Sequence, residues 1–323
     1  WLRFGIDHRT RYENLAAPVR SGGAETHKAL SLRTLLRAEI DISPFVIGGE
    51  FADSRLYLAE EKMPIGTSLV NPVELLQAYV ATHIEDVLVT DSKLTVRMGR
   101  LTMDVGSRRF VARNGFRNTI NGFSGVHADW GSPNHGRAHI FATMPVHRRP
   151  TQPDRLAANE IEFDRESINV LFGGAFYALG PWSHGLRLEG FAFALNERDY
   201  GDVGTRDRAL ITPGLRFYRQ PKDGAVDWEF EGAIQMGRSR ASKSVEDTKD
   251  LDHFAAMTRV ALGYTLRARW HPRFLVFHDY ASGDESAEDG ANGRYDTLFG
   301  ARRFEYGPTG IHGPFARSNI NSP

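Results

Sequence analysis

The sequence predicts an all-β protein that folds as an antiparallel up-and-down transmembrane β-barrel. The first observation is a strict alternation of apolar and polar residues along 1–13, 30–42 and 226–236. Because successive side chains of a strand point to opposite faces, each segment has one apolar face and one charged face. The alternation runs for about eleven to thirteen residues, which is near the length of a tilted membrane-spanning strand and exceeds a usual strand of a soluble sandwich.

The second observation is that the expected connections alternate in length. Turn residues mark the short connections, which lie at 43–44, 131–136, 181–184, 221–224 and 270–272, with a somewhat longer one near 84–92. Long polar loops are expected between them, near 15–28, 55–72, 102–118, 147–166, 198–208 and 239–252, and from 282 onward. Tight turns at one end and long loops at the other are typical of outer-membrane barrels, whereas a soluble sandwich has no reason to sort its loops in this way.

These signals predict about thirteen strands in sequence order. They span 1–14, 29–42, 45–54, 73–83, 93–101, 119–130, 137–146, 167–179, 185–197, 209–220, 225–238, 253–266 and 273–281. Pro213 lies inside one of them, and since proline cannot donate a ladder hydrogen bond, a β-bulge is expected there. Convincing helical periodicity is absent throughout.

Composition excludes several classes of protein. The chain has 323 residues with 40 Lys plus Arg and 40 Asp plus Glu, and this balance does not indicate a nucleic-acid partner. No stretch approaches eighteen consecutive apolar residues, so helical membrane spans are excluded. The lack of cysteine excludes a disulfide scaffold and cysteine-ligated metals.

Residues 1–323 are expected to form one barrel domain that is incomplete at the C-terminus. Bacterial barrels close with an even number of strands, so an odd number of strands is expected beyond residue 323. The chain begins at Trp1 without an initiator methionine or a signal peptide, which indicates a trimmed or fragmentary sequence.

Assigning the apolar residues to lipid places the polar residues in the lumen. The predicted pore-lining, substrate-binding residues are Arg3, Arg9, Arg11, Arg33, Arg37, Arg97, Arg187, Arg216, Arg259, Asp7, Glu39, Glu189, Glu229 and Glu231. The first five arginines share one hairpin and form a basic patch, whereas Asp227, Glu229 and Glu231 form an acidic row. Water-facing arginines would steer anions, above all carboxylates. The alternative is that they pair with lumenal acids and only solvate a wide barrel.

Aromatic residues near the strand ends indicate a girdle at the membrane–water boundary, with sugar stacking as the alternative. They are Trp1, Tyr12, Trp130, Trp228, Tyr264 and Tyr280. Gln77 and Tyr79 face the same side as Arg97 on the next expected strand. Their side chains either bind sugar hydroxyls or fill the barrel wall.

The sequence does not indicate an enzyme or a cofactor. The histidines show no metal-binding spacing, and Ser282-Gly283-Asp284 lacks the glycines of a nucleophile elbow. A Ser–His–acid site assembled from distant strands remains an alternative. Asp284, Glu285, Glu288 and Asp289 are a weak candidate for Ca²⁺ in an outer loop, but their spacing differs from an EF-hand, and a solvated loop is the simpler interpretation.

Several short motifs stand out along the chain. They are Gln77–Val80 with Leu94–Arg100, Asn121–Val126, Asp279–Asp284, Asp289-Gly290 and Tyr295–Phe299. Together, in this order, they resemble the alginate-export family of outer-membrane proteins. The chain departs from the family at Thr297, where the family has proline, and in the longer turn near 84–92. The most specific motif is the Tyr-Ala-Ser-Gly-Asp block at 280–284.

The resemblance implies a monomeric barrel of about eighteen strands in the outer membrane of a Gram-negative bacterium, so that about five C-terminal strands would be missing. It further implies an arginine-rich constriction and passive, anion-selective export of an alginate-like polyuronate. Expected partners are an anionic polysaccharide or oligosaccharide, outer-membrane lipid and lipopolysaccharide, and periplasmic secretion proteins. The alternatives are a general or substrate-specific porin for small organic acids or sugars, and a barrel enzyme or surface-binding barrel occluded by its loops.

Overall fold

The fold is known from a computed structural model, which describes residues 1–16, 26–180, 185–244, 246–286, 289–301 and 316–322. The expected turn at 181–184 lies outside these residues, as does Glu288. No helix among the described residues is long and apolar enough to cross a membrane.

The expected strands are all present, with small differences at their ends. They are β1 (Leu2–Ala16), β2 (Thr26–Ile42), β3 (Phe45–Tyr57), β4 (Asn71–Glu85), β5 (Lys93–Leu101), β6 (Phe123–Ser132), β7 (Gly136–Pro145), β8 (Val170–Leu179), β9 (Leu186–Glu197), β10 (Ala209–Arg219), β11 (Val226–Ser239), β12 (Leu251–Thr265) and β13 (Arg273–Ala281). Two short strands follow, β14 (Ala291–Asn292) and β15 (Ile320–Ser322), and one short helix, α1 (Pro153–Ala157), lies in the loop expected at 147–166.

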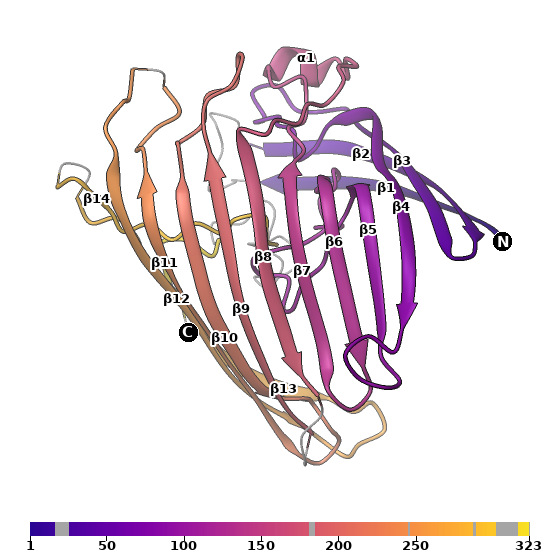
Figure 1. The fold of residues 1–323 in the computed structure, drawn as a ribbon. Coiled ribbons are helices and arrows are strands. Elements are labelled where there is room, and N and C mark those ends of the chain that lie inside the picture. Colours follow the sequence, from indigo (N-terminus) through magenta and orange to yellow (C-terminus); the bar gives the residue numbers. More distant parts are fainter. Residues whose placement is uncertain (17–25, 181–184, 245, 287–288, 302–315, 323) are drawn as a thin grey trace.

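The strands form one sheet in which each long strand pairs antiparallel with the strands before and after it in the chain. β15 extends the sheet beyond β13, and β14 pairs parallel with β12. Within the described part of the chain, β1 does not pair with β13 or β15, so the sheet is open. Figure 1 shows the sheet curving around an interior, with short turns at its lower end and the long connections at its upper end. The predicted all-β, up-and-down architecture is confirmed.

The two faces of the sheet differ as the alternation requires. On β2, Leu36 and Ile40 are exposed on the outer face, whereas Ser31, Arg33 and Leu35 are buried on the inner face. The neighbouring strands have the same arrangement, because the side chains of residues paired across a ladder lie on the same face of the sheet. The outer face is therefore an apolar band that suits lipid.

Most of the aromatic residues near the strand ends occupy this outer face. Tyr12, Tyr264 and Tyr280 are exposed there, whereas Trp1, which is also exposed, has the parity of Arg3 on the inner face. Tryptophan and tyrosine rings with one apolar side and one polar tip are suited to the membrane–water boundary.

The β-bulge expected at Pro213 is not formed. Ile211 pairs with Met236 and Gly214 with Ala233 in unchanged register. The β11 ladder is interrupted at this point without gaining a residue. The register shifts lie instead between β3 and β4, near Glu50 and Ala52.

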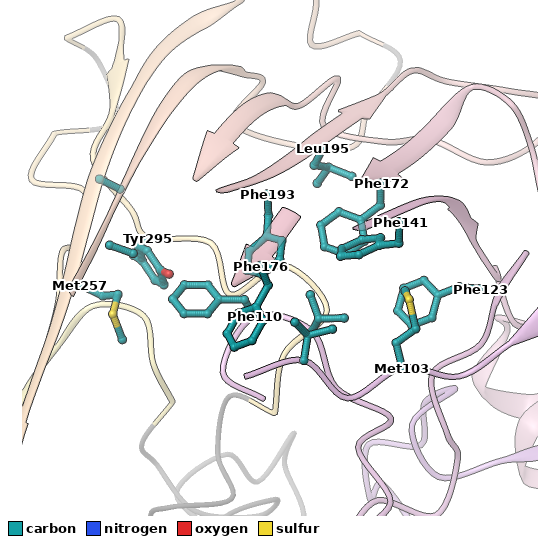
Figure 2. Packing of buried hydrophobic residues seen from close by; sticks show 14 of the residues in the cluster. Met103, Phe110, Phe123, Phe141, Phe172, Phe176, Phe193, Leu195, Met257 and Tyr295 are labelled. Carbon is teal, nitrogen blue, oxygen red and sulfur yellow. The ribbon is translucent and has the colours of Figure 1, made fainter. Parts of the chain in front are cut away.

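The loop expected at 102–118 is not simply polar. Met103, Val105, Phe110 and Val111 from this loop are buried against the inner face of the sheet. Figure 2 shows Met103 and Phe110 beside Phe141, Phe172 and Phe193, which come from β7, β8 and β9. The rings of Phe110 and Phe193 are 5.9 Å apart. The protein therefore has an apolar core inside the curved sheet, built by strands and by a loop that folds inward.

Candidate functional site

All of the predicted pore-lining residues lie on the inner face. Arg3 pairs with Glu39 and Arg9 with Arg33 in the β1–β2 ladder, on the same side as the buried Ser31. On the opposite wall Arg216 lies between Glu189 of β9 and Glu231 of β11 in the ladders. The neighbouring pairings place Arg97, Arg187, Glu229 and Arg259 on this same face. These charges therefore lie on the side of the sheet that faces the enclosed space.

The inner face is crossed by residues 102–122, which connect β5 to β6 and are called the inward segment below. Its early part contacts β11, since Ser107 Oγ donates a hydrogen bond of 2.7 Å to Glu231. Its later part contacts β1 and β2, since Arg9 Nη2 donates a hydrogen bond of 2.7 Å to the carbonyl of Arg117. Because β11 and β1 are far apart in the sheet, the inward segment spans the space that the sheet encloses.

Three arginines of the first hairpin hold the inward segment through its backbone. Arg9 Nη1 donates to the carbonyls of Gly115 and Phe116, each at 3.1 Å, and Arg11 Nη1 donates to the carbonyl of Phe116 at 2.8 Å. Arg33 Nη1 donates to the carbonyls of Gly115 and Arg117 at 2.7 and 3.0 Å. A carbonyl satisfies a guanidinium hydrogen bond without neutralising its charge, so this wall stays electropositive.

The nearby carboxylates do not fully balance these three arginines. Asp7 lies 3.8 Å from Arg33, and Glu13 lies 3.1 Å from Arg11. Neither acid makes an ion pair with Arg9 among the described residues. A net positive charge therefore remains on this part of the inner wall.

The other two arginines of the hairpin have carboxylate partners. Arg37 donates to the buried Glu50 at 3.1 Å, and Arg113 of the inward segment donates to the same oxygen at 2.8 Å. Gln77 Nε2 donates to the second oxygen of Glu50. Arg3 lies 3.2 Å from Glu39, which also accepts a hydrogen bond of 3.0 Å from Tyr79. Gln77 and Tyr79 thus bind wall carboxylates in this structure.

The opposite wall carries a denser charge network that the sequence did not reveal. Arg109 of the inward segment donates to Glu229 at 2.6 Å and also to Glu231, whose side chain is buried. Arg216 donates to Glu229 at 2.8 Å and to Glu189 at 3.3 Å. The acidic row therefore serves partly to hold the inward segment.

Arg259 belongs to the same network at its far edge. Its Nη1 donates to the buried Asp279 at 2.7 Å, and its Nε lies 3.7 Å from Glu229. Its guanidinium also stacks over Phe277, 4.4 Å from the ring centre.

Arg97 and Arg187 differ from the other predicted arginines. Among the described residues neither has a carboxylate within ion-pair distance, and neither donates a hydrogen bond to another side chain. Arg187 lines a cavity of about 220 Å³ near the short turns, together with Glu189, Tyr218 and Arg137. Within the described part of the chain, their guanidinium groups are therefore not neutralised by a contacting carboxylate.

Comparison with known proteins then assigns the chain. The family model described as alginate export matches residues 1–323. The chain belongs to the alginate-export family. No curated protein matches the chain. Alginate export is transport of a polysaccharide across the outer membrane rather than a chemical transformation, and the lipid-facing and charged faces of the sheet agree with this.

The motifs of the alginate-export family have identifiable structural roles here. Asn121 Nδ2 donates to the carbonyls of Ala112 and Phe299, at 2.9 and 3.0 Å, and so joins the inward segment to the last motif. Phe299 in turn packs on Phe172, with ring centres 4.8 Å apart. Asn121 and Phe299 of these motifs thus lie inside the curved sheet.

Asn118 anchors the inward segment and was not identified from the sequence pattern. Its side-chain Nδ2 lies within hydrogen-bond distance of the carbonyls of Leu32, Arg55 and Leu69, at 3.1, 3.2 and 2.8 Å. The only signal in the sequence was the group of apolar residues Val105, Phe110 and Val111 within an otherwise polar loop. Such a group predicts burial but does not identify the partners.

The last family motif is attached to the wall through Arg208 and Gln235. Arg208 donates to both carboxylate oxygens of Glu197, at 2.7 and 2.8 Å, and to Asp296 at 2.6 Å. The backbone of Asp296 is held by the side chain of Gln235, which accepts from its N–H at 2.9 Å. Burial alone would raise the pKa of Asp296, but the Arg208 charge outweighs burial and holds the pKa below its ordinary value.

This arrangement predicts an acid-sensitive attachment. A carboxylate whose pKa is lower in the folded state than in the unfolded state adds to the free energy of unfolding while it is charged. This contribution is lost as the pH falls through the lowered pKa. We expect wild type to unfold at a higher temperature than Asp296→Asn at neutral pH, and the difference to shrink towards about pH 3.

The arginine variant Arg208→Met provides the control. In that background Asp296→Asn should no longer destabilise the protein, because the charge that Asp296 stabilises has been removed. An equal effect of Asp296→Asn in both backgrounds would contradict this coupling.

The weak calcium site is not supported by a cluster of ligands. Asp284 and Asp289 accept hydrogen bonds from the N–H groups of Gly293 and Ala291, each at 3.0 Å. Within the described ranges no group of His, Asp or Glu side chains is placed to hold a metal ion. Calcium binding here stays a prediction.

Proposed function

We propose that this chain forms the wall of an anion-selective channel through which an alginate-like polyuronate leaves the cell. The proposal is supported by inner-face guanidinium groups that lack a carboxylate partner among the described residues. Arg9 is held by carbonyls, and Arg97 and Arg187 have no carboxylate partner among the described residues. A polyuronate carries a carboxylate on each sugar, and an arginine binds a carboxylate through two hydrogen bonds.

Transport by such a wall requires no nucleotide and no covalent step. Guanidinium groups on the wall would balance the negative charge of the polymer in place of its counter-ions. The polymer would therefore enter the lumen without the cations that accompany it in solution. Conduction also requires that each contact be weak enough to exchange. Arginines already held by backbone carbonyls or by acids retain only part of their hydrogen-bonding capacity, which suits repeated exchange along the polymer.

The second candidate is a porin for small organic acids or sugars. The inward segment and the phenylalanine core favour it, because they occupy part of the enclosed space and narrow the passage. Such a pore would conduct small anions but would not be blocked by a long polymer.

Planar-bilayer recordings test the proposal. We expect an anion-selective current that polymannuronate blocks, and we expect Arg97→Ala with Arg187→Ala to move the reversal potential in a salt gradient towards zero and to weaken the block. Arg219→Ala with Arg267→Ala is the control, because it removes the same two charges elsewhere. Arg219 lies at the end of β10 on the outer face, and Arg267 is exposed in the short connection after β12. An unchanged reversal potential in the double variant contradicts the arginine wall, and open conductance without polymer block favours the porin.

A further inference from the structure

The outer face of the sheet has a hollow over its middle strands that the transport function does not use. It is a groove of about 770 Å³ that crosses β6 to β11 and is lined almost entirely by apolar atoms. Figure 1 shows that these strands are neighbours. The lining residues lie near the strand ends from which the long connections begin. In outer-membrane barrels the long loops face the cell exterior, so the groove lies at the level of the outer leaflet.

The groove exists because small residues replace large ones in one row of the outer face. Ala142 of β7 pairs with Gly173 of β8, and Gly173 pairs with Ala194 of β9. The next positions of the row, Ile211 of β10 and Met236 of β11, are large and exposed and form one wall. The row spans about 20 Å, since neighbouring strands lie about 4.8 Å apart. A trough of this length can hold an extended hydrocarbon chain.

Two exposed arginines lie beside the groove on the side of the long loops. Arg238 is paired with Ala209, which itself lines the groove. Arg198 follows directly after β9, two residues beyond the lining residue Asn196. Asp252 is the ladder partner of Arg238 on β12, yet the two side chains do not form an ion pair. No acid pairs with Arg198 either, as far as the chain is described.

We propose that this groove binds one acyl chain of a phosphorylated glycolipid of the outer leaflet, with Arg198 and Arg238 at its phosphate groups. The apolar trough selects a hydrocarbon chain, and the arginines select a headgroup with net negative charge. A zwitterionic phospholipid has no net charge and gains less from two arginines. The separation of the two arginines, on either side of β10, suits a headgroup that carries more than one phosphate.

Native mass spectrometry of the protein in detergent micelles tests this site with diphosphorylated lipid A and with phosphatidylethanolamine as probes. We expect wild type to retain one lipid A and to retain phosphatidylethanolamine more weakly. Ala194→Trp fills the trough and should abolish retention. Arg198→Glu with Arg238→Glu should weaken it about tenfold or more.

Matched controls separate the groove from general effects. Ala192→Trp adds the same bulk on the outer face of β9 but outside the groove, and it should retain lipid A as wild type does. Arg219→Glu with Arg267→Glu reverses the same charge near the short turns and should also leave retention unchanged. Unaltered channel conductance and heat-modifiable gel mobility show that each variant is folded.

Three results would overturn the proposal. Ala194→Trp could retain lipid A as wild type does, or both lipids could be retained equally, which indicates general lipid contact. A dimer of the wild-type protein that Ala194→Trp dissociates would assign the groove to a second copy of the chain.

Discussion

Replacing residues 103–121 by an Asn-Gly turn should raise single-channel conductance several-fold and reduce anion selectivity. The inward segment lies across the enclosed space, and its removal takes away both its volume and Arg109, Arg113 and Arg117. The turn can close because Leu101 already pairs with Phe123 in the β5–β6 ladder. Single-channel recordings in planar bilayers measure both quantities.

A shorter loop elsewhere is the control for this deletion. Removing residues 242–249, whose described members are mostly exposed at the long-loop end, should leave conductance unchanged. Wild-type conductance in the 103–121 variant would show that the inward segment does not narrow the passage.

Glu231→Ala should be the most destabilising single substitution on the inner wall. The carboxylate of Glu231 is buried and accepts hydrogen bonds from Arg109 and Ser107. Its removal takes away a carboxylate that balances the buried positive charge of Arg109. Breaking a buried ion pair typically lowers the free energy of unfolding by about 3–5 kcal/mol. Urea unfolding in detergent, followed by tryptophan fluorescence, measures the loss.

Two further variants make the result specific. Glu231→Gln keeps an acceptor oxygen and should cost less than Glu231→Ala. Asp41→Ala removes an exposed carboxylate 3.7 Å from Arg3 and should cost at most about 1 kcal/mol. Equal losses for Glu231→Ala and Asp41→Ala would contradict a structural role for the Arg109–Glu231 pair.

The strands could be predicted because lipid and the lumen impose opposite demands on the two faces of each strand. That contrast repeats every second residue, so β2 and β11 are recognisable from their own sequences. The ends of β6 and β8 were less certain, because Thr119, Ile120 and Ile168 continue the apolar pattern without belonging to the sheet. Local periodicity cannot separate such residues from a strand.

The same alternation predicted on which face of the sheet each site residue lies. It did not predict the hydrogen-bond or ion-pair partners of these residues. Arg9 lies 108 positions from Arg117, whose carbonyl it binds, and nothing in either local sequence specifies that contact. The clearest sign in the sequence of a covered inner face is the presence of apolar residues at strand positions that should face water. These residues are Phe141, Phe172 and Phe193. They are buried because the inward segment and the last family motif cover them.

The inward segment also has a mechanical consequence. A β-barrel is ordinarily held only around its circumference, by ladders between adjacent strands, and its cross-section can flatten without breaking a ladder bond. Here Arg109 ties the segment to β11, and Arg9 and Arg33 tie it to the first hairpin, so it acts as a transverse strut. A strut of this kind fixes the distance between opposite walls, and with it the width available to whatever passes.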